Sequence, residues 1–385
     1  MSGWRAGAAL DSPVVDFDLS DDQQALAGAA RSLLDGLASP EQVRAHMATG
    51  QPYDTKLWRS MAEQGWLGID VPSSLGGLGL GFVETAVLIE ELGRHVAPAP
   101  LVPSVLALGA VVSSELGAVS SAPGAVSSWV EPLVAGDAVG CVAWAGPRSP
   151  VSAVRSGSGD DGWVLNGRPA PVVAAPAADV ALVWTPSDVY LVDLGAVGRP
   201  PAEAAMDVTQ SVGWLTFDDT PAVRLGGAEA ATRMLDRAAV AWSAELLGGA
   251  ARVLEMASEY AKERVQFGKP IGSFQAVKHR CADMVVDVEG MRSSTWYAAW
   301  CLAAGDSEAS VAASAAKVWC ADAAKRVMAS GLQVHGGIGF TWEHDLHLYL
   351  KRSQLGQVSF GDAPYHRDRL AGLLRRRVEA GEPVI

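Results

Sequence analysis

The sequence contains few cysteines, and none is placed as a metal site or a disulfide framework would require. The four are Cys141, Cys281, Cys301 and Cys320, and no two of them form a CxxC pair. Structural zinc sites need closely spaced cysteine or histidine ligands, and small disulfide scaffolds need many cysteines in a short chain. Neither kind of site is indicated.

Clustered positive charge and long apolar runs are also missing. The chain has 30 Lys and Arg against 43 Asp and Glu, a net charge of −13, which argues against nucleic acid or an anionic membrane as a partner. The N-terminal MSGWRAGAALDSPVV lacks the apolar segment of a secretory signal. The apolar stretch VAPAPLVPSVLALGAVVSSELG reads as a loop, because prolines divide it into runs too short to span a bilayer. We expect a soluble, cytoplasmic protein.

The pattern along the 385 residues predicts an α+β multidomain fold. Residues 1–130 are expected to form an N-terminal helical domain, beginning at a capping box made by Ser20 and Gln23. Residues 131–228 contain short runs such as GCVAWAG and ADVALVWT between Gly, Pro and Asp, which is typical of a small antiparallel β domain. Residues 229–385 are expected to form a C-terminal four-helix bundle.

Four long helical patterns make up the predicted bundle. They are MLDRAAVAWSAELLGGAARVLEMASEYAKERVQFG, about 275–304, about 308–330 ending at Gly331, and about 365–378. The first carries an apolar stripe at helical spacing, which indicates a buried face.

The junction between the first two of these helices, ERVQFGKPIGSFQ, combines residue types that packing alone does not require. Arg264 could bind an anionic phosphate, Gly268 lets the backbone approach a ligand, and Phe267 offers a ring to a flat heterocycle. The alternative is that Arg264 only caps the C-terminus of the preceding helix.

A second glycine-rich junction follows the third helix, in GLQVHGGIGFTWEHDLHLYLKRS. Gln333, Gly336 and Gly337 lie here, before a new helix begins. One GGxG turn is weak evidence for phosphate binding. Two such junctions in one bundle make a ligand site the better interpretation.

Both segments resemble the acyl-CoA dehydrogenase family, and the resemblance extends over the whole chain through GWLGIDVPSSLGGLGLGFVETAVLIEELGR and LNGRPAPVVAAPAADVALV. It implies an FAD-dependent α,β-desaturation of an acyl-CoA thioester, with an electron-transfer flavoprotein or similar acceptor. It also implies that the two junctions contact the FAD whose flavin ring lies in a neighbouring subunit. The residues so assigned are Arg264, Phe267, Gln275, Gln333, Gly336 and Gly337.

The position of the catalytic base departs from the family pattern. The family's proton-abstracting glutamate usually lies in the last bundle loop, where VSFGDAPYHRDRL places Gly361, followed by Asp362. In some family branches the base lies on the first long bundle helix, and the matching position here is Ala238. Glu245 lies two turns further along that helix, about 10 Å away by helix rise. Its alternative role is that of a polar residue satisfied at a helix crossing.

The β domain departs from the pattern as well. The family's Thr-Glu-Pro…Gly-Ser-Asp loop is replaced by CVAWAGPRSP. The tryptophan and threonine that cover the flavin ring in the family are matched by Pro171 and Val173. A valine side chain cannot donate a hydrogen bond to a flavin.

The site for the chain's own flavin is thus eroded, while the segments offered to a neighbour's FAD are kept. This combination favours one subunit of a heteromer, a dimer of dimers in which a homologous sister chain supplies the flavin pocket and the base. Heteromeric members of the family act on steroid or other bulky CoA esters in actinobacteria. The alternatives are a homomeric enzyme with Asp362 or Glu245 as its base, a non-catalytic structural subunit, and a flavin monooxygenase or nitroalkane-oxidising relative.

Overall fold

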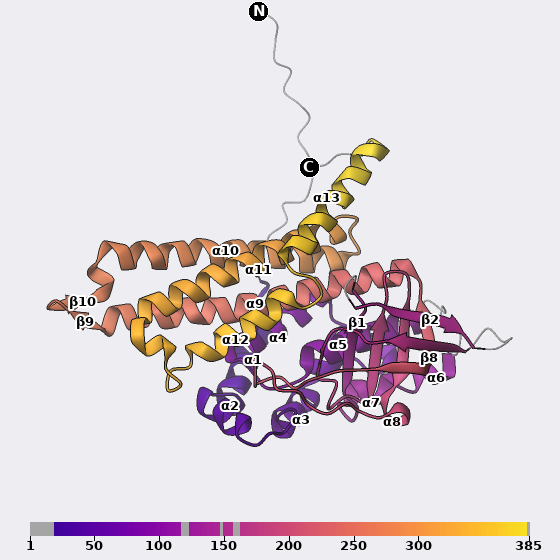
Figure 1. Ribbon diagram of the computed structural model, residues 1–385. Coiled ribbons are helices and arrows are strands. Elements are labelled where there is room, and N and C mark those ends of the chain that lie inside the picture. The colour runs from indigo at the N-terminus through magenta and orange to yellow at the C-terminus, as the bar shows by residue number, and fades with distance from the viewer. Residues whose placement is uncertain (1–18, 117–122, 147–148, 157–161, 383–385) are drawn as a thin grey trace, which may run out of the picture.

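The computed structural model describes residues 19–116, 123–146, 149–156 and 162–382. Helices from the first third of the chain lie beneath a long helical bundle, and a β-sheet lies beside them, at the end of the molecule opposite the β9–β10 hairpin (Figure 1). The fold class expected from the sequence is confirmed in outline. The predicted features of residues 1–18 and of Pro147 and Arg148 lie outside the described residues.

The N-terminal part consists of helices joined by short turns. They are α1 Asp21–Leu37, α2 Pro40–Met47, α3 Thr55–Glu63, η1 Trp66–Gly68, η2 Ser73–Leu75, α4 Phe82–His95, α5 Leu101–Leu116, α6 Pro123–Ser127 and α7 Val130–Ala135. The predicted capping box opens α1, because the Gln23 amide donates to Ser20 Oγ at 3.3 Å and the Ser20 amide donates to Gln23 Oε1 at 3.1 Å.

Helix α5 corrects the expectation that the apolar stretch after residue 96 is a loop. Its Pro103 lies in the first turn, where a backbone N–H has no partner within the helix, so the proline is tolerated. The helix packs against strand β1 of the sheet, which explains its apolar composition. No helix among the described residues is both long enough and apolar enough to cross a membrane.

The six-stranded sheet has the order β1-β5-β6-β8-β3-β2, and it is mixed rather than antiparallel as expected. Strands β1 and β5 pair in parallel, from Gly140↔Val180 to Trp144↔Trp184. Both are continuous apolar runs of mostly buried residues, as is typical of strands covered on both faces. The six strands are β1 Gly140–Trp144, β2 Val151–Arg155, β3 Trp163–Gly167, β5 Val180–Trp184, β6 Val189–Asp193 and β8 Phe217–Gly226, and the short helix α8 Leu194–Val197 follows β6. Strands β4 Val172–Val173 and β7 Val212–Gly213 pair with each other in a separate two-stranded sheet.

The bundle contains five helices among the described residues rather than four. They are α9 Ala228–Glu263, α10 Gln275–Ala304, α11 Ala309–His335, α12 Leu346–Val358 and α13 Ala363–Ala380, with β9 Val265–Gln266, β10 Lys269–Pro270, η3 Ile271–Ser273 and η4 Gly336–Phe340 between them. Helix α11 continues four residues past Gly331. A Cβ at Gly331 would lie 2.5 Å from Val253 Cγ1, so this glycine allows close packing against α9 and does not end the helix.

Two glycines bring the N-terminal helices into close contact with the bundle. A Cβ at Gly93 of α4 would lie 2.2 Å from the Glu245 carbonyl oxygen, and one at Gly248 of α9 would lie 1.9 Å from the Glu90 carbonyl oxygen. Helices α4 and α9 therefore cross at backbone contact, which no larger residue permits.

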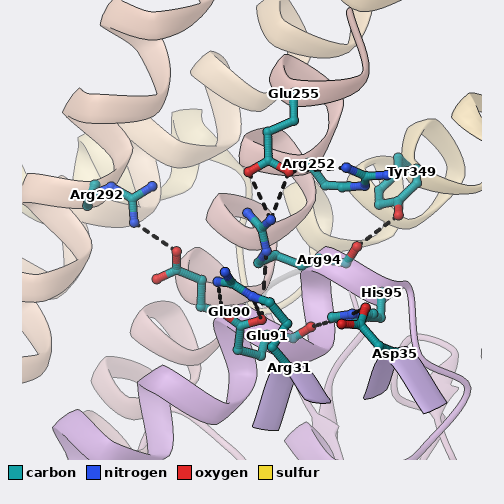
Figure 2. A network of polar contacts seen from close by, with 10 residues as sticks. All are labelled: Arg31, Asp35, Glu90, Glu91, Arg94, His95, Arg252, Glu255, Arg292 and Tyr349. Atoms are coloured by element: carbon teal, nitrogen blue, oxygen red, sulfur yellow. Dashed lines mark hydrogen bonds and ion pairs between the residues drawn. The ribbon is translucent and has the colours of Figure 1, made fainter. Parts of the chain in front are cut away.

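Ion pairs reinforce this crossing around α4 (Figure 2). The pairs are Arg31–Glu91 at 2.5 Å, Arg94–Glu255 at 2.8 Å and Arg292–Glu90 at 2.9 Å. They connect α4 with α1, α9 and α10. In addition, the Tyr349 hydroxyl of α12 donates to the Arg94 carbonyl oxygen at 2.8 Å. The helices that carry the candidate site are thereby held in one framework.

Candidate functional site

A cavity of about 600 Å³ lies where the sheet meets the bundle. Its wall is formed by Trp144 at the end of β1, Val173 of β4, Trp242 of α9 and the turn between α12 and α13, including Phe360 and Asp362. Pro171 and Gly361 also line it. The positions matched to the family's flavin-covering residues, Pro171 and Val173, and to its usual base, Gly361, thus lie around one cavity.

Aromatic rings dominate one wall of this cavity. Phe360 stacks on Trp184 with 5.2 Å between ring centroids and an interplanar angle of 6°. Trp144 packs edge-on against Tyr365 at 5.2 Å and lies 6.4 Å from Phe360. These contacts fix the turn between α12 and α13 against the sheet.

Gly361 occupies a position that does not accept a side chain. Its φ is +103°, a conformation that L-residues rarely adopt, and a Cβ there would lie 2.4 Å from Tyr365 Cδ1 and 3.0 Å from His366 Nε2. A carboxylate at this position would therefore require both backbone strain and displacement of Tyr365. The backbone excludes the family's usual base from this turn.

Asp362 lines the cavity but serves as a helix cap. It is the N-cap of α13, and its Oδ1 accepts a hydrogen bond from the Tyr365 amide at 3.0 Å. The side chain is half-buried. A carboxylate held by a backbone amide is restrained in orientation.

Glu245 is buried in α9 and does not line this cavity. Its Oε1 lies 2.5 Å from Arg352 Nη1, and Arg352 also pairs with Asp207 at 2.6 Å and donates to Thr209 Oγ1 at 2.6 Å. Burial raises the pKa of Glu245, and the neighbouring Arg352 acts in the opposite direction. This geometry favours the alternative role of Glu245, a polar residue satisfied at a crossing of helices. Ala238, at the second family position for the base, is fully buried, and its methyl side chain cannot accept a proton.

The first glycine-containing junction forms the tip of the bundle, far from the sheet (Figure 1). Arg264 is the C-cap residue of α9 through its backbone, while its side chain is exposed and forms no ion pair with any described residue. Phe267 is 91% exposed at a positive φ of 50°, and its ring contacts Phe274 edge-on at 6.0 Å. Gln275 is exposed at the first position of α10.

The second junction lies at the same end of the bundle. The His335 ring at the end of α11 stacks on Tyr260 of α9, with 4.8 Å between centroids, so the turn that follows lies close to the end of α9. Gln333 and Gly337 are exposed. A Cβ at Gly337 would meet nothing within 4 Å, so no packing inside the chain requires a glycine there. The structure thus brings together the two segments that the sequence singled out.

Exposed apolar side chains surround these segments, and the sequence analysis did not identify them. Phe340 is 74% exposed and Trp342 is 66% exposed. Apolar side chains gathered at one end of a molecule mark a contact surface more often than scattered ones do. The signal in the sequence was the string GFTW directly after the glycines.

Arg44 of α2 is a second residue that the sequence analysis missed. It donates from Nε to Asp345 Oδ1 at 2.9 Å and from Nη1 to the Trp342 carbonyl oxygen at 2.7 Å. The N-terminal part of the chain thereby holds the loop that follows the glycines. No motif in the sequence links residues so far apart.

Comparison with known proteins identifies the family of the chain. Residues 20–126 match the profile of the acyl-CoA dehydrogenase N-terminal domain, and residues 226–374 match that of the C-terminal domain. The acyl-CoA dehydrogenase IpdE2 of Mycobacterium tuberculosis is 35% identical over 89% of this chain and 94% of its own length. These matches confirm the family recognised in the sequence.

Two solved assemblies share the fold. The ChsE4–ChsE5 complex from Mycobacterium tuberculosis aligns with a TM-score of 0.84 and 32% identity, over 96% of this chain and all of the matched chain. The Tcur3481–Tcur3483 steroid ACAD aligns with a TM-score of 0.84 and 31% identity, over 93% of this chain and 99% of the matched chain. The chain belongs to the acyl-CoA dehydrogenase family of FAD-dependent oxidoreductases that act on CH–CH bonds.

Proposed function

We propose that this chain is one subunit of a heteromeric acyl-CoA dehydrogenase, in which it contributes FAD contacts to a sister chain that holds the flavin ring and the base. The observation that carries the proposal is the contrast between the two ends of the molecule. At the cavity, the turn between α12 and α13 excludes a carboxylate at Gly361. At the bundle tip, Arg264, Phe267 and Gly337 are exposed and accessible to a partner.

The open residues suit the adenosine diphosphate part of FAD. An exposed Arg264 guanidinium can pair with a phosphate oxygen, and a 91% exposed Phe267 ring can pack against adenine. The Gln275 and Gln333 amides can donate to phosphate or ribose oxygens, and the Gly336 and Gly337 backbone can approach closely. Bound FAD would supply the hydride acceptor for α,β-desaturation of the acyl-CoA.

The names of the two solved relatives support the proposal of a heteromer that acts on a bulky substrate. Both solved relatives described above are complexes of two differently named proteins, and one of them is named a steroid ACAD. We extend this to a homologous sister subunit in a dimer of dimers, a bulky or steroid acyl-CoA ester in lipid catabolism, an electron-transfer flavoprotein or similar acceptor, and a cytoplasmic location. The division into units of 1–130, 131–228 and 229–385 belongs to the same proposal, and the change from helix to strand after Ala135 and back at Ala228 supports it.

A homomeric enzyme that uses Asp362 is the second candidate, because this carboxylate does line the cavity. It would have to act as a base while it caps α13. A non-catalytic structural subunit that only completes its partner's cofactor site is the third.

Replacing Arg264 tests the proposal in the complex co-expressed with its sister chain. We expect Arg264→Ala to raise the Kd of FAD about tenfold or more, because a charge-assisted hydrogen bond to phosphate contributes roughly 1.5–3 kcal/mol. Flavin content and FAD titration of the apo-complex measure this. Arg233→Ala is the matched control, since Arg233 is an exposed arginine of the same helix that pairs with Glu229. Unchanged FAD affinity and turnover in Arg264→Ala would mean that Arg264 is only a helix cap.

A further inference from the structure

Three histidines gather where the loop after α11 meets the start of α12. His335 ends α11, and its buried ring stacks on Tyr260 at 4.8 Å and packs edge-on against His344 at 4.6 Å between ring centroids. His347 lies in the first turn of α12 and packs edge-on against the Trp342 ring at 4.9 Å. The cluster thus lies against the loop that leads from the glycine-containing turn η4 into α12.

His344 caps the N-terminus of α12. Its Nδ1 accepts a hydrogen bond at 3.1 Å from the Leu346 amide, the first amide of the helix. Asp345, the N-cap residue, caps no amide of the described helix with its side chain, and its carboxylate pairs with Arg44 at 2.8 Å. An imidazole nitrogen accepts a hydrogen bond only while it carries no proton. The cap therefore exists only when His344 is neutral.

The surroundings of His344 oppose its protonation. Burial and the neighbouring His335 lower the pKa of His344, and Arg44 and His347 act in the same direction. Asp345 acts in the opposite direction, but it already pairs with Arg44. The N-terminus of a helix carries a partial positive charge, which also disfavours a cation there. The closed loop therefore holds His344 in its neutral form.

His347 has a similar environment. Its Nε2 lies 3.3 Å from the Trp342 carbonyl oxygen and 3.5 Å from Arg44 Nη2, and its Nδ1 is buried without a hydrogen-bond partner among the described residues. Burial lowers the pKa of His347, and the cations Lys351 and Arg44 lower it further. The Trp342 carbonyl and Asp345 act in the opposite direction. A second proton in the cluster would thus be opposed as well.

From this geometry, and resting on the proposed function, we infer that His344 is a positioning residue through which protons control the binding of the sister chain's FAD. Neutral His344 caps α12 and keeps the loop in place, and the loop holds Gly336 and Gly337. Protonated His344 cannot cap α12 and is repelled by Arg44, so the loop opens and the turn loses its fixed position. Below the ordinary histidine pKa of about 6.5, the open loop binds more protons than the closed loop, so the affinity for FAD falls with pH.

Titration of FAD into the apo-complex between pH 7.5 and 5.5 tests the inference. We expect the Kd to rise at least about tenfold, because a histidine with a pKa of about 6.5 in the open loop takes up one proton over this range. His344→Asn keeps an acceptor at the position of Nδ1 but does not titrate. We expect it to reduce the rise by about tenfold and to leave the Kd at pH 7.5 within about twofold of the unsubstituted complex.

Two further variants separate the acceptor from other effects of the substitution. His344→Leu removes the acceptor, so its Kd for FAD should be high already at pH 7.5. His95→Asn, at a half-buried histidine of α4 outside the cluster, is the control and should keep the full pH dependence. Hydrogen exchange of residues 341–348 in the FAD-free complex gives a readout that does not involve the cofactor. After correction for the intrinsic effect of pH, protection should fall on acidification, and it should fall less in His344→Asn.

Two results would overturn the inference. One is the same pH dependence of the Kd in His344→Asn and in the unsubstituted complex. The other is tighter FAD binding at low pH, which a protonated histidine in direct contact with a phosphate would cause. If Arg264→Ala still weakens FAD binding in either case, the proposed function stands and this inference alone fails. FAD affinity that depends on neither Arg264 nor pH would contradict both.

Discussion

At the scale of single residues, Gly361 determines which side chains the turn between α12 and α13 accepts. Its φ is positive, and a Cβ there would lie 2.4 Å from Tyr365 Cδ1. The backbone of the turn therefore leaves no room for a carboxylate at this position. The absence of a carboxylate at this position is therefore coupled to the aromatic packing around Trp144 and Phe360. A glutamate placed at position 361 by a single substitution would have to adopt a strained backbone conformation and displace Tyr365.

The buried Lys317 predicts how the free energy of unfolding changes with pH. It is fully buried in α11, donates from Nζ to the Gly356 carbonyl oxygen, and burial lowers its pKa from 10.5 to about 7. Between these values the unfolded chain binds one proton more than the folded chain, so the free energy of unfolding rises with pH, by up to about 1.4 kcal/mol per unit. The gain is complete above the unfolded pKa and is lost as pH falls toward 7.

Urea unfolding of the complex at a fixed protein concentration, from pH 7 to 10, measures this contribution. We expect Lys317→Met to flatten the rise in the unfolding midpoint with pH. Lys325→Met, at an exposed lysine of the same helix, should leave the slope as it is in the unsubstituted chain. Equal slopes in all three proteins would show that Lys317 stays protonated in the fold.

At the scale of elements, the loop after α11 depends on a helix far away in the sequence. Arg44 of α2 binds the loop at Asp345 and at the Trp342 carbonyl oxygen. We expect Arg44→Gln to raise the Kd of FAD in the complex about three- to tenfold by loosening the Gly336–Phe340 turn, since each lost hydrogen bond is worth roughly 0.5–1.5 kcal/mol.

Two measurements distinguish positioning from a general effect on stability. Limited proteolysis should cut the loop faster in Arg44→Gln while the melting temperature falls little, and Arg44→Lys should restore part of the FAD affinity. Arg224→Gln is the control, because Arg224 pairs with Asp188 in the sheet and is about as exposed as Arg44. A Kd for FAD that is the same in Arg44→Gln and Arg224→Gln would exclude the positioning role.

The sequence predicted most elements whose signals are local. The capping box of α1 and the bounds of α10 follow from neighbouring residues, and both are confirmed. The helix α5 was missed because its proline counts as a breaker in the sequence, although it is harmless in a first turn. The end of α11 was placed at Gly331 because close packing against Val253 leaves no mark on the local sequence.

In the candidate site, too, the parts with local sequence signals were predicted and the parts that depend on distant contacts were not. The two glycine-containing junctions are short motifs, and the structure places them at one end of the bundle through the Tyr260–His335 stack. The parallel pairing of β1 with β5, the aromatic wall and the Arg44 anchor all join distant parts of the chain. Such contacts require the tertiary structure and could not be read from spacing.

At the scale of the whole molecule, the two ends differ in the residues that they present. The bundle tip offers open charged, aromatic and glycine residues with exposed Phe340 and Trp342 beside them. The cavity end has an apolar aromatic wall, and among its described lining residues the one carboxylate is Asp362, which caps a helix. This division fits a subunit that completes a partner's cofactor site and leaves proton abstraction to the partner.

Turnover of the co-expressed complex carrying Asp362→Asn tests this division most directly. Asparagine caps a helix about as well as aspartate, so the turn is kept while the proton acceptor is lost. Dehydrogenation of a bulky acyl-CoA ester, followed through reduction of ferrocenium at constant FAD content, should stay within about twofold of the unsubstituted complex. A fall of about 10²–10⁴-fold, the usual effect of losing a positioned general base, would place the base in this chain and contradict the account.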